Sequence, residues 1–129
     1  MIKLHMSKLE NNFSNNILTQ EAELSAIKSF YQLRKDSEVT QFLEEHPFLI
    51  SLLIELYDKI RYYFDSDTEM ILDLVTDPEA EVDRVLFALI RTKLPSSRAL
   101  DRLDRLDDEW WLENLHHAEG KLCIDVDFG

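Results

Sequence analysis

Residues 47–64, PFLISLLIELYDKIRYYF, carry the strongest helical pattern of the chain. Apolar side chains recur there every three or four residues, which is the period of an α-helix. Pro47 suits the first position of a helix and disfavours helical backbone in the residue before it. The pattern predicts a central helix with a wide apolar stripe, made of Leu49, Leu52, Leu53, Leu56, Ile60, Tyr63 and Phe64.

Two further helices are predicted before this central one. Leu24, Ile27, Tyr31 and Arg34 have helical spacing, so a helix is expected from Thr19 to about Lys35. A shorter helix should begin at Ser37 and end near His46. Residues 1–18 are rich in asparagine and have no sustained period, and Met6 is an alternative start. We therefore predict a loosely ordered arm over 1–18 and a single domain over 19–129.

After residue 68 the pattern changes to that of strands. Residues 69–76 and 85–92 are β-rich runs, and the Asp77-Pro78 turn sequence between them favours a hairpin. A helix should follow from Pro95, and Gly120 is placed to end the helical region. Residues 122–128 alternate apolar and polar side chains, which is typical of a half-exposed strand.

These elements predict an α+β fold, in which N-terminal helices precede a β-β-α-β unit. The economical arrangement is a small three-stranded, mostly antiparallel sheet of order 2-1-3, although a parallel partner for the second strand stays open. Both hairpin strands are apolar on nearly every residue, so both faces of the sheet should be at least partly covered. If every helix lay on one face, the other face would be exposed.

Composition excludes several classes of partner. The 129-residue chain has 26 acidic and 14 basic residues and a formal net charge of -12, which repels nucleic-acid phosphates and anionic lipids. Its apolar runs are too short for a membrane span. The start lacks the apolar stretch of a signal peptide, and Cys123 has no second cysteine for a disulfide. We expect a cytoplasmic protein with no cofactor.

Three aspartates form the sharpest candidate for chemistry. Asp73, Asp125 and Asp127 share one face if the first and third predicted strands are neighbours, with Asp77 near the end of the first strand. Clustered carboxylates attract Mg²⁺ or Mn²⁺, which prefer oxygen ligands. The alternative is an ordinary solvated sheet face on which Arg84, Arg91 or Lys121 balances the charge, and the antiparallel pattern favours it.

Trp110 and Trp111 are adjacent on a predicted helix. Two successive helical residues face one core only if the helix is strained or broken near Asp107. One indole should therefore be buried, and the other is a candidate for an interface, where tryptophan is enriched.

Four short strings carry a resemblance to a known family. They are His46-Pro47-Phe48-Leu49, Asp77-Pro78-Glu79-Ala80, Asp108-Glu109-Trp110-Trp111 and residues 120–127, GKLCIDVD. Over roughly residues 37–128 the chain resembles a family of small bacterial proteins, notably cyanobacterial, to which no activity is assigned. The resemblance implies a bacterial cytoplasmic protein and transfers no functional residue.

Three functions follow from these patterns. The favoured one is a non-enzymatic protein-interaction module that forms a homodimer, because apolar strand surface exceeds what the helices cover. The second is a divalent-metal-dependent enzyme that acts on a phosphorylated substrate through the three aspartates. The third is an acidic mimic of nucleic acid that binds a basic protein. The sequence contains no catalytic signature that favours the enzyme.

Overall fold

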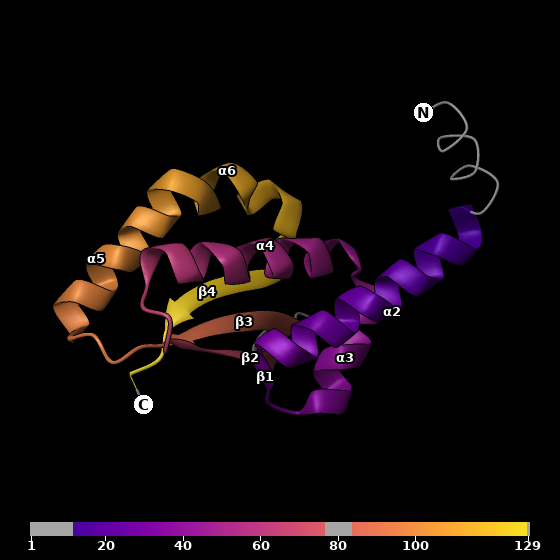
Figure 1. Ribbon diagram of the computed structural model, residues 1–129, viewed down its shortest axis with the longest axis horizontal. Helices are drawn as coiled ribbons and strands as arrows, with labels where there is room; N and C mark the ends of the chain where they lie inside the picture. The colour runs from indigo at the N-terminus through magenta and orange to yellow at the C-terminus, as the bar shows by residue number, and fades with distance from the viewer. Residues whose placement is uncertain (1–11, 77–83, 129) are drawn as a thin grey trace.

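The computed structural model describes residues 12–76 and 84–128, with the backbone alone for residues 12–19. In this part of the chain, helices lie against a four-stranded sheet (Figure 1). The elements in chain order are α2 (Asn12–Phe30), β1 (Gln32–Leu33), α3 (Asp36–Glu45), α4 (Phe48–Tyr63), β2 (Glu69–Thr76), β3 (Arg84–Arg91), α5 (Ser96–Leu106), the π-helical turn η1 (Asp107–Trp111), α6 (Leu112–Asn114), the 3-10 helix η2 (Leu115–Ala118) and β4 (Leu122–Val126).

The sheet has the order β1-β2-β3-β4. Its central pair, β2 and β3, is antiparallel, whereas β1 pairs with β2 and β4 pairs with β3 in parallel. The α+β class is confirmed, but the predicted three-stranded order 2-1-3 is wrong. The short strand β1 occupies the edge of β2 that the last strand was expected to take. The last strand instead lies beside β3 after a helical connection, as a parallel pair requires.

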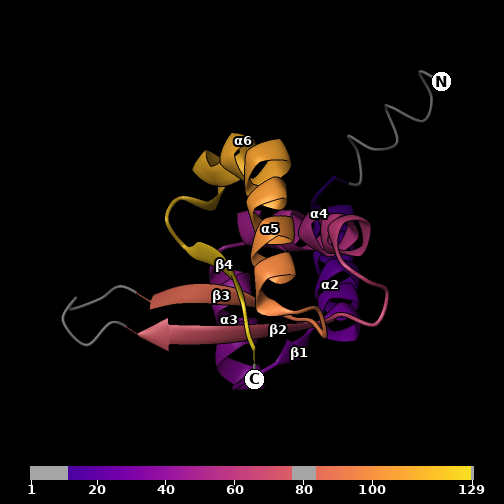
Figure 2. The same cartoon turned by 90° about the vertical axis from the view of Figure 1, so that its left-hand side faces the viewer.

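The main core lies between α4 and one face of the sheet, called here the helix face. Figures 1 and 2 place α4, α5 and α6 on this side of the strands. Every residue of the predicted α4 stripe is buried, so the prediction of a central helix is confirmed. The helix face contributes Met70, Leu72, Leu74, Leu86, Ala88, Ile90, Leu122, Ile124 and Val126 to this core.

The boundaries of the first helix differ from the prediction, whereas α3 lies close to the bounds expected for the second helix. Helix α2 already begins at Asn12 and ends at Phe30, because the chain turns there to form β1. Lys35 adopts a left-handed conformation with φ 55° just before α3, which separates α3 from β1. Residues 1–11 of the predicted arm and residues 77–83, including Asp77 and the predicted hairpin loop, lie outside the described residues.

A π-helical turn buries both tryptophans. The Leu112 N–H donates to the carbonyl of Asp107, which is the i→i+5 bond of a π-turn. The wider turn lets Trp110 and Trp111 point to the same core, where they are 6% and 7% exposed. Trp110 Nε1 also donates to Glu55 Oε1 of α4 at 2.9 Å. The local pattern thus predicted an irregularity at the right place, but the expectation that one indole lies outside the core is wrong.

The first residue of the π-turn, Asp107, leads to a testable pH dependence. Burial, followed by the charges of Asp104, Asp108 and Asp125, raises the pKa of the Asp107 carboxyl. A carboxyl whose pKa is higher in the folded than in the unfolded state binds protons more tightly when folded. Its contribution therefore opposes folding at neutral pH, and this opposition fades as the pH falls through the folded pKa.

Asp107→Asn should raise the melting temperature at pH 7 by about 1 °C, as for a weak, partly screened effect. The increment should shrink toward pH 3, where both states are protonated. Melting curves across this pH range test it, with Asp101→Asn on the exposed side of α5 as control. A lower melting temperature for Asp107→Asn at pH 7 would contradict the assignment.

Candidate interaction surface

The side of the sheet away from α4 is called here the open face. Side chains alternate between the two faces along each strand, so the residues between those of the helix face belong to it. The register places Asp73, Phe87 and Cys123 in one row across the strands, and Ile71, Leu89 and Asp125 in the next. The open face comprises Glu69, Ile71, Asp73, Val75, Val85, Phe87, Leu89, Arg91, Cys123 and Asp125, together with Asp127 just beyond β4 and with Arg34 and Lys35, which follow β1 and contact Asp73.

This face carries apolar side chains that remain accessible to solvent. Val75 is 42% exposed, and Val85, Phe87 and Leu89 are only partly buried. Ile71 is the exception at 1% exposed, although it lies outside the main core cluster. The open face is therefore only partly covered, in contrast to the helix face.

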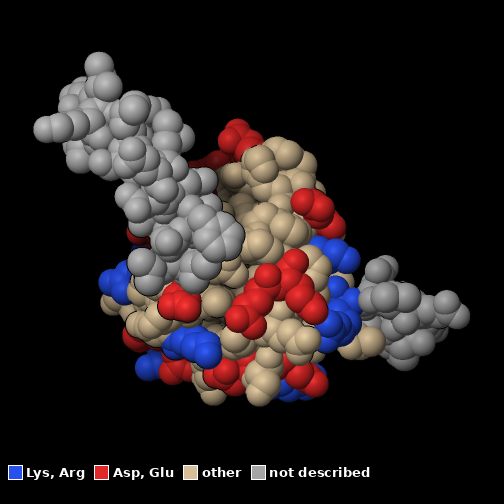
Figure 3. Space-filling model, turned by 90° about the vertical axis from the view of Figure 1, so that its right-hand side faces the viewer, with Lys and Arg blue, Asp and Glu red and all other residues tan. Residues whose placement is uncertain are grey.

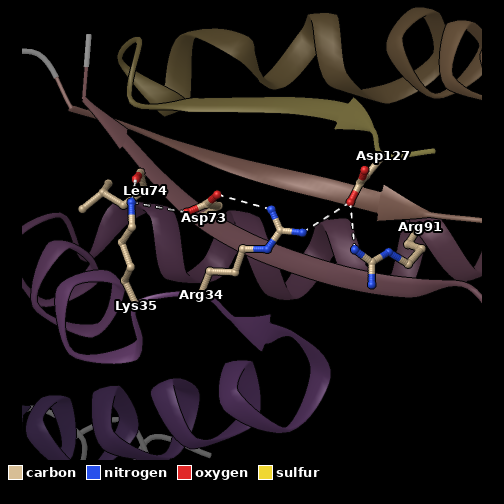
Figure 4. Close-up of polar contacts among 6 residues, drawn as sticks. All are labelled: Arg34, Lys35, Asp73, Leu74, Arg91 and Asp127. Atoms are coloured by element: carbon tan, nitrogen blue, oxygen red, sulfur yellow. Dashed lines mark hydrogen bonds and ion pairs between the residues drawn. The ribbon is translucent and has the colours of Figure 1, made fainter. Parts of the chain in front are cut away.

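A chain of ion pairs runs over the open face (Figure 4). The Arg34 guanidinium contacts Asp73 Oδ2 and Asp127 Oδ2, each at 3.4 Å, from its place just after β1. Arg91 Nη2 contacts the same Asp127 oxygen at 3.0 Å, and Lys35 Nζ lies 3.9 Å from Asp73 Oδ1. The row of Ile71 and Leu89 lies between the rows of Asp73 and Asp127. The guanidinium of Arg34 therefore joins two aspartates whose rows lie on either side of this apolar row.

The open face is nearly neutral on an otherwise acidic protein. Its cations are Arg34, Lys35 and Arg91, and its carboxylates are Glu69, Asp73, Asp125 and Asp127. The whole chain, by contrast, has a formal net charge of -12. A nearly neutral face repels another acidic protein less than a face that carries the full excess of negative charge would.

The structure brings two of the three candidate aspartates into one network. Arg34 lies between Asp73 and Asp127, so their charges are compensated by a cation rather than left to attract a metal. Asp125 points elsewhere, since its Oδ1 accepts the backbone N–H of Val126 at 2.8 Å. In the described part of the chain, no group of three or more His, Cys, Asp or Glu side chains is arranged to hold a metal ion.

The tryptophans named as interface candidates do not form an exposed patch. Both indoles pack inside the chain, with ring centroids 5.8 Å apart, because of the π-turn. Their burial removes the reason for placing them at an interface. The exposed apolar residues of the outer helices are instead Leu100, Leu112 and Leu115.

A surface pocket between α4 and η2 is the main alternative site. It has a volume of about 430 Å³, and its lining includes Ser51, Glu55, His116 and His117. The two imidazole centroids lie 3.9 Å apart, and no hydrogen bond joins Ser51 to either ring among the described residues. The pocket therefore lacks the nucleophile and base in contact that would indicate catalysis.

The surface charges on one side of the molecule do not favour the nucleic-acid mimic. Figure 3 shows Asp and Glu side chains interspersed with Lys and Arg on that side. A mimic needs an unbroken series of negative charges, as along a phosphate backbone. Separately, no helix in the described segments has the length and hydrophobicity that crossing a membrane requires.

Comparisons of the chain with protein-family models, with curated proteins and with solved structures find no match. The resemblance to small bacterial proteins therefore stays a prediction.

Proposed function

We propose that the chain is a non-enzymatic protein-interaction module that forms a homodimer through the open face of its sheet. The observation that carries the proposal is the accessible set of Val75, Val85, Phe87 and Leu89 on a face that no helix covers within the described residues. Sheets of this kind bury such faces against a second sheet at a spacing of about 10 Å.

The charges of the open face favour a second copy as the partner. In a two-fold symmetric dimer the same patch meets itself, so a patch of one sign would be repelled. The open face carries both signs in alternation, so that Arg34 or Arg91 of one copy can meet a carboxylate of the other. The contacts of Arg34 at 3.4 Å are longer than typical hydrogen bonds, which leaves its guanidinium able to exchange partners.

The size of the face sets the expected affinity. Strands about 4.8 Å apart and of about 3.3 Å per residue give a four-stranded face of roughly 20 by 26 Å at its longest. A face with these sides has an outline of about 520 Å². Each partner in a standard interface buries roughly 800 Å², so the dimer should be weak. Such a module fits a reducing bacterial cytoplasm, since the thiol of Cys123 is free and exposed.

Light scattering over a concentration series tests the dimer. From about 1 µM to 1 mM, the range in which a weak interface is populated, the mass should rise from that of one chain to that of two. A mass that stays at one chain throughout would contradict the proposal. A mass that continues to rise beyond two chains would contradict the closed two-fold arrangement.

A further inference from the structure

The free edge of β4 is a second surface on which a partner strand could pair. Strand β4 ends the sheet on one side, and no strand pairs with its outer edge within residues 12–76 and 84–128. The opposite edge belongs to β1, which has only two residues. An uncovered edge strand offers a row of unpaired backbone groups to another chain.

The hydrogen bonds to β3 identify which amides of β4 point outward. The N–H of Leu86 donates to the carbonyl of Lys121, and the N–H of Asp127 donates to the carbonyl of Ile90. In a parallel ladder, alternate residues of one strand bond to the same neighbour. The N–H groups of Leu122, Ile124 and Val126 therefore point away from β3.

One of these outward N–H groups already donates a hydrogen bond to the carboxylate of Asp125. Its Oδ1 accepts the N–H of Val126 at 2.8 Å, and the side chain is exposed at the sheet edge. An incoming strand would have to displace this carboxylate before its carbonyl could accept the same proton. The negative charge also opposes the approach of a carbonyl oxygen, and charged side chains are a known means of protecting sheet edges.

We infer that Asp125 closes the free edge of β4 to strand addition. On the proposed function, this confines pairing of the chain to the open face. The role also explains why Asp125 stands apart from the network of Asp73 and Asp127. Without its charge, the run Leu122-Cys123-Ile124 would continue into Val126 as a short apolar segment of high β-propensity.

The test compares Asp125→Ala, which removes the acceptor, with Asp125→Asn, which keeps an oxygen at the same position. Both are made in a Phe87→Glu background, so that pairing through the open face does not contribute. Asp104→Ala on α5 is the control for loss of one exposed negative charge. The readouts are hydrogen exchange of the Val126 amide in dilute protein and the mass distribution against concentration.

For Asp125→Ala we expect exchange of the Val126 amide to accelerate about tenfold or more and assemblies to grow with concentration. Asp125→Asn keeps the acceptor oxygen but not the charge, so it should keep the slow amide and assemble less than Asp125→Ala. Asp104→Ala should keep both the slow amide and the starting mass. Unchanged exchange or an unchanged mass for Asp125→Ala would overturn the inference, as would equal assembly of Asp125→Asn. If the wild-type chain is a monomer, the proposed dimer is contradicted but the edge can still be tested. Asp125→Ala and Asp125→Asn are then compared without the Phe87→Glu substitution.

Discussion

Leu53→Ala should lower the free energy of unfolding by about 2–5 kcal/mol, the range for removing a fully buried leucine side chain. Leu53 is inaccessible to solvent in the middle of α4. The carbonyl of the same residue accepts a hydrogen bond from the buried hydroxyl of Tyr31, which directly follows α2. Neighbouring elements hold the site on several sides, so it should collapse only in part and leave a cavity.

Chemical denaturation followed by tryptophan fluorescence measures this loss, because Trp110 and Trp111 lie in the same core. Asp58→Ala, at an exposed position of α4, is the matched control and should change stability by no more than about 0.5 kcal/mol. An unchanged midpoint and slope for Leu53→Ala would show that α4 is not the centre of the core.

Phe87→Glu should convert the proposed dimer to a monomer. Phe87 is a partly buried aromatic in the row of Asp73 and Cys123, near the middle of the open face. Loss of a central aromatic contact costs about 2 kcal/mol or more, and a two-fold interface contains the residue twice. The dissociation constant should therefore rise on the order of a hundredfold or more.

Sedimentation equilibrium measures this change, and circular dichroism establishes that the variant is folded. Leu112→Glu introduces the same charge at a 58% exposed leucine of α6 and should leave the dissociation constant unchanged. Val75→Glu, at a more accessible site of the open face, is a second variant that should also weaken the dimer. It tests the open face if Phe87→Glu does not fold. If Leu112→Glu dissociated the dimer and Phe87→Glu did not, the interface would lie on the outer helices, and the proposed open-face dimer would be contradicted.

The sequence predicted those elements whose own residues determine their structure. Helix α4 and strands β2 and β3 have patterns long enough to establish their type and approximate ends. Strand β1 was not predicted, because two residues carry no periodicity and its pairing depends on β2. The predicted sheet order was wrong for the same reason, since β1 takes the edge of β2 on which the last strand was expected.

The candidate site was predicted in part. An excess of apolar strand surface indicated a face without helices, and Arg91 was named as a partner for the aspartates. Arg34 was missed because helical spacing placed it on the apolar stripe of the first helix, whereas that helix ends at Phe30. The Asp125 contact with Val126 depends on strand-edge geometry, which no residue pattern shows.

Isotope-filtered nuclear Overhauser spectroscopy on a mixture of labelled and unlabelled chains tests the proposed dimer most directly. At concentrations where the mass is that of two chains, we expect intermolecular contacts among Val75, Val85 and Phe87 of the open face. Intermolecular contacts confined to the outer helices, at Leu112 and Leu115, would contradict it.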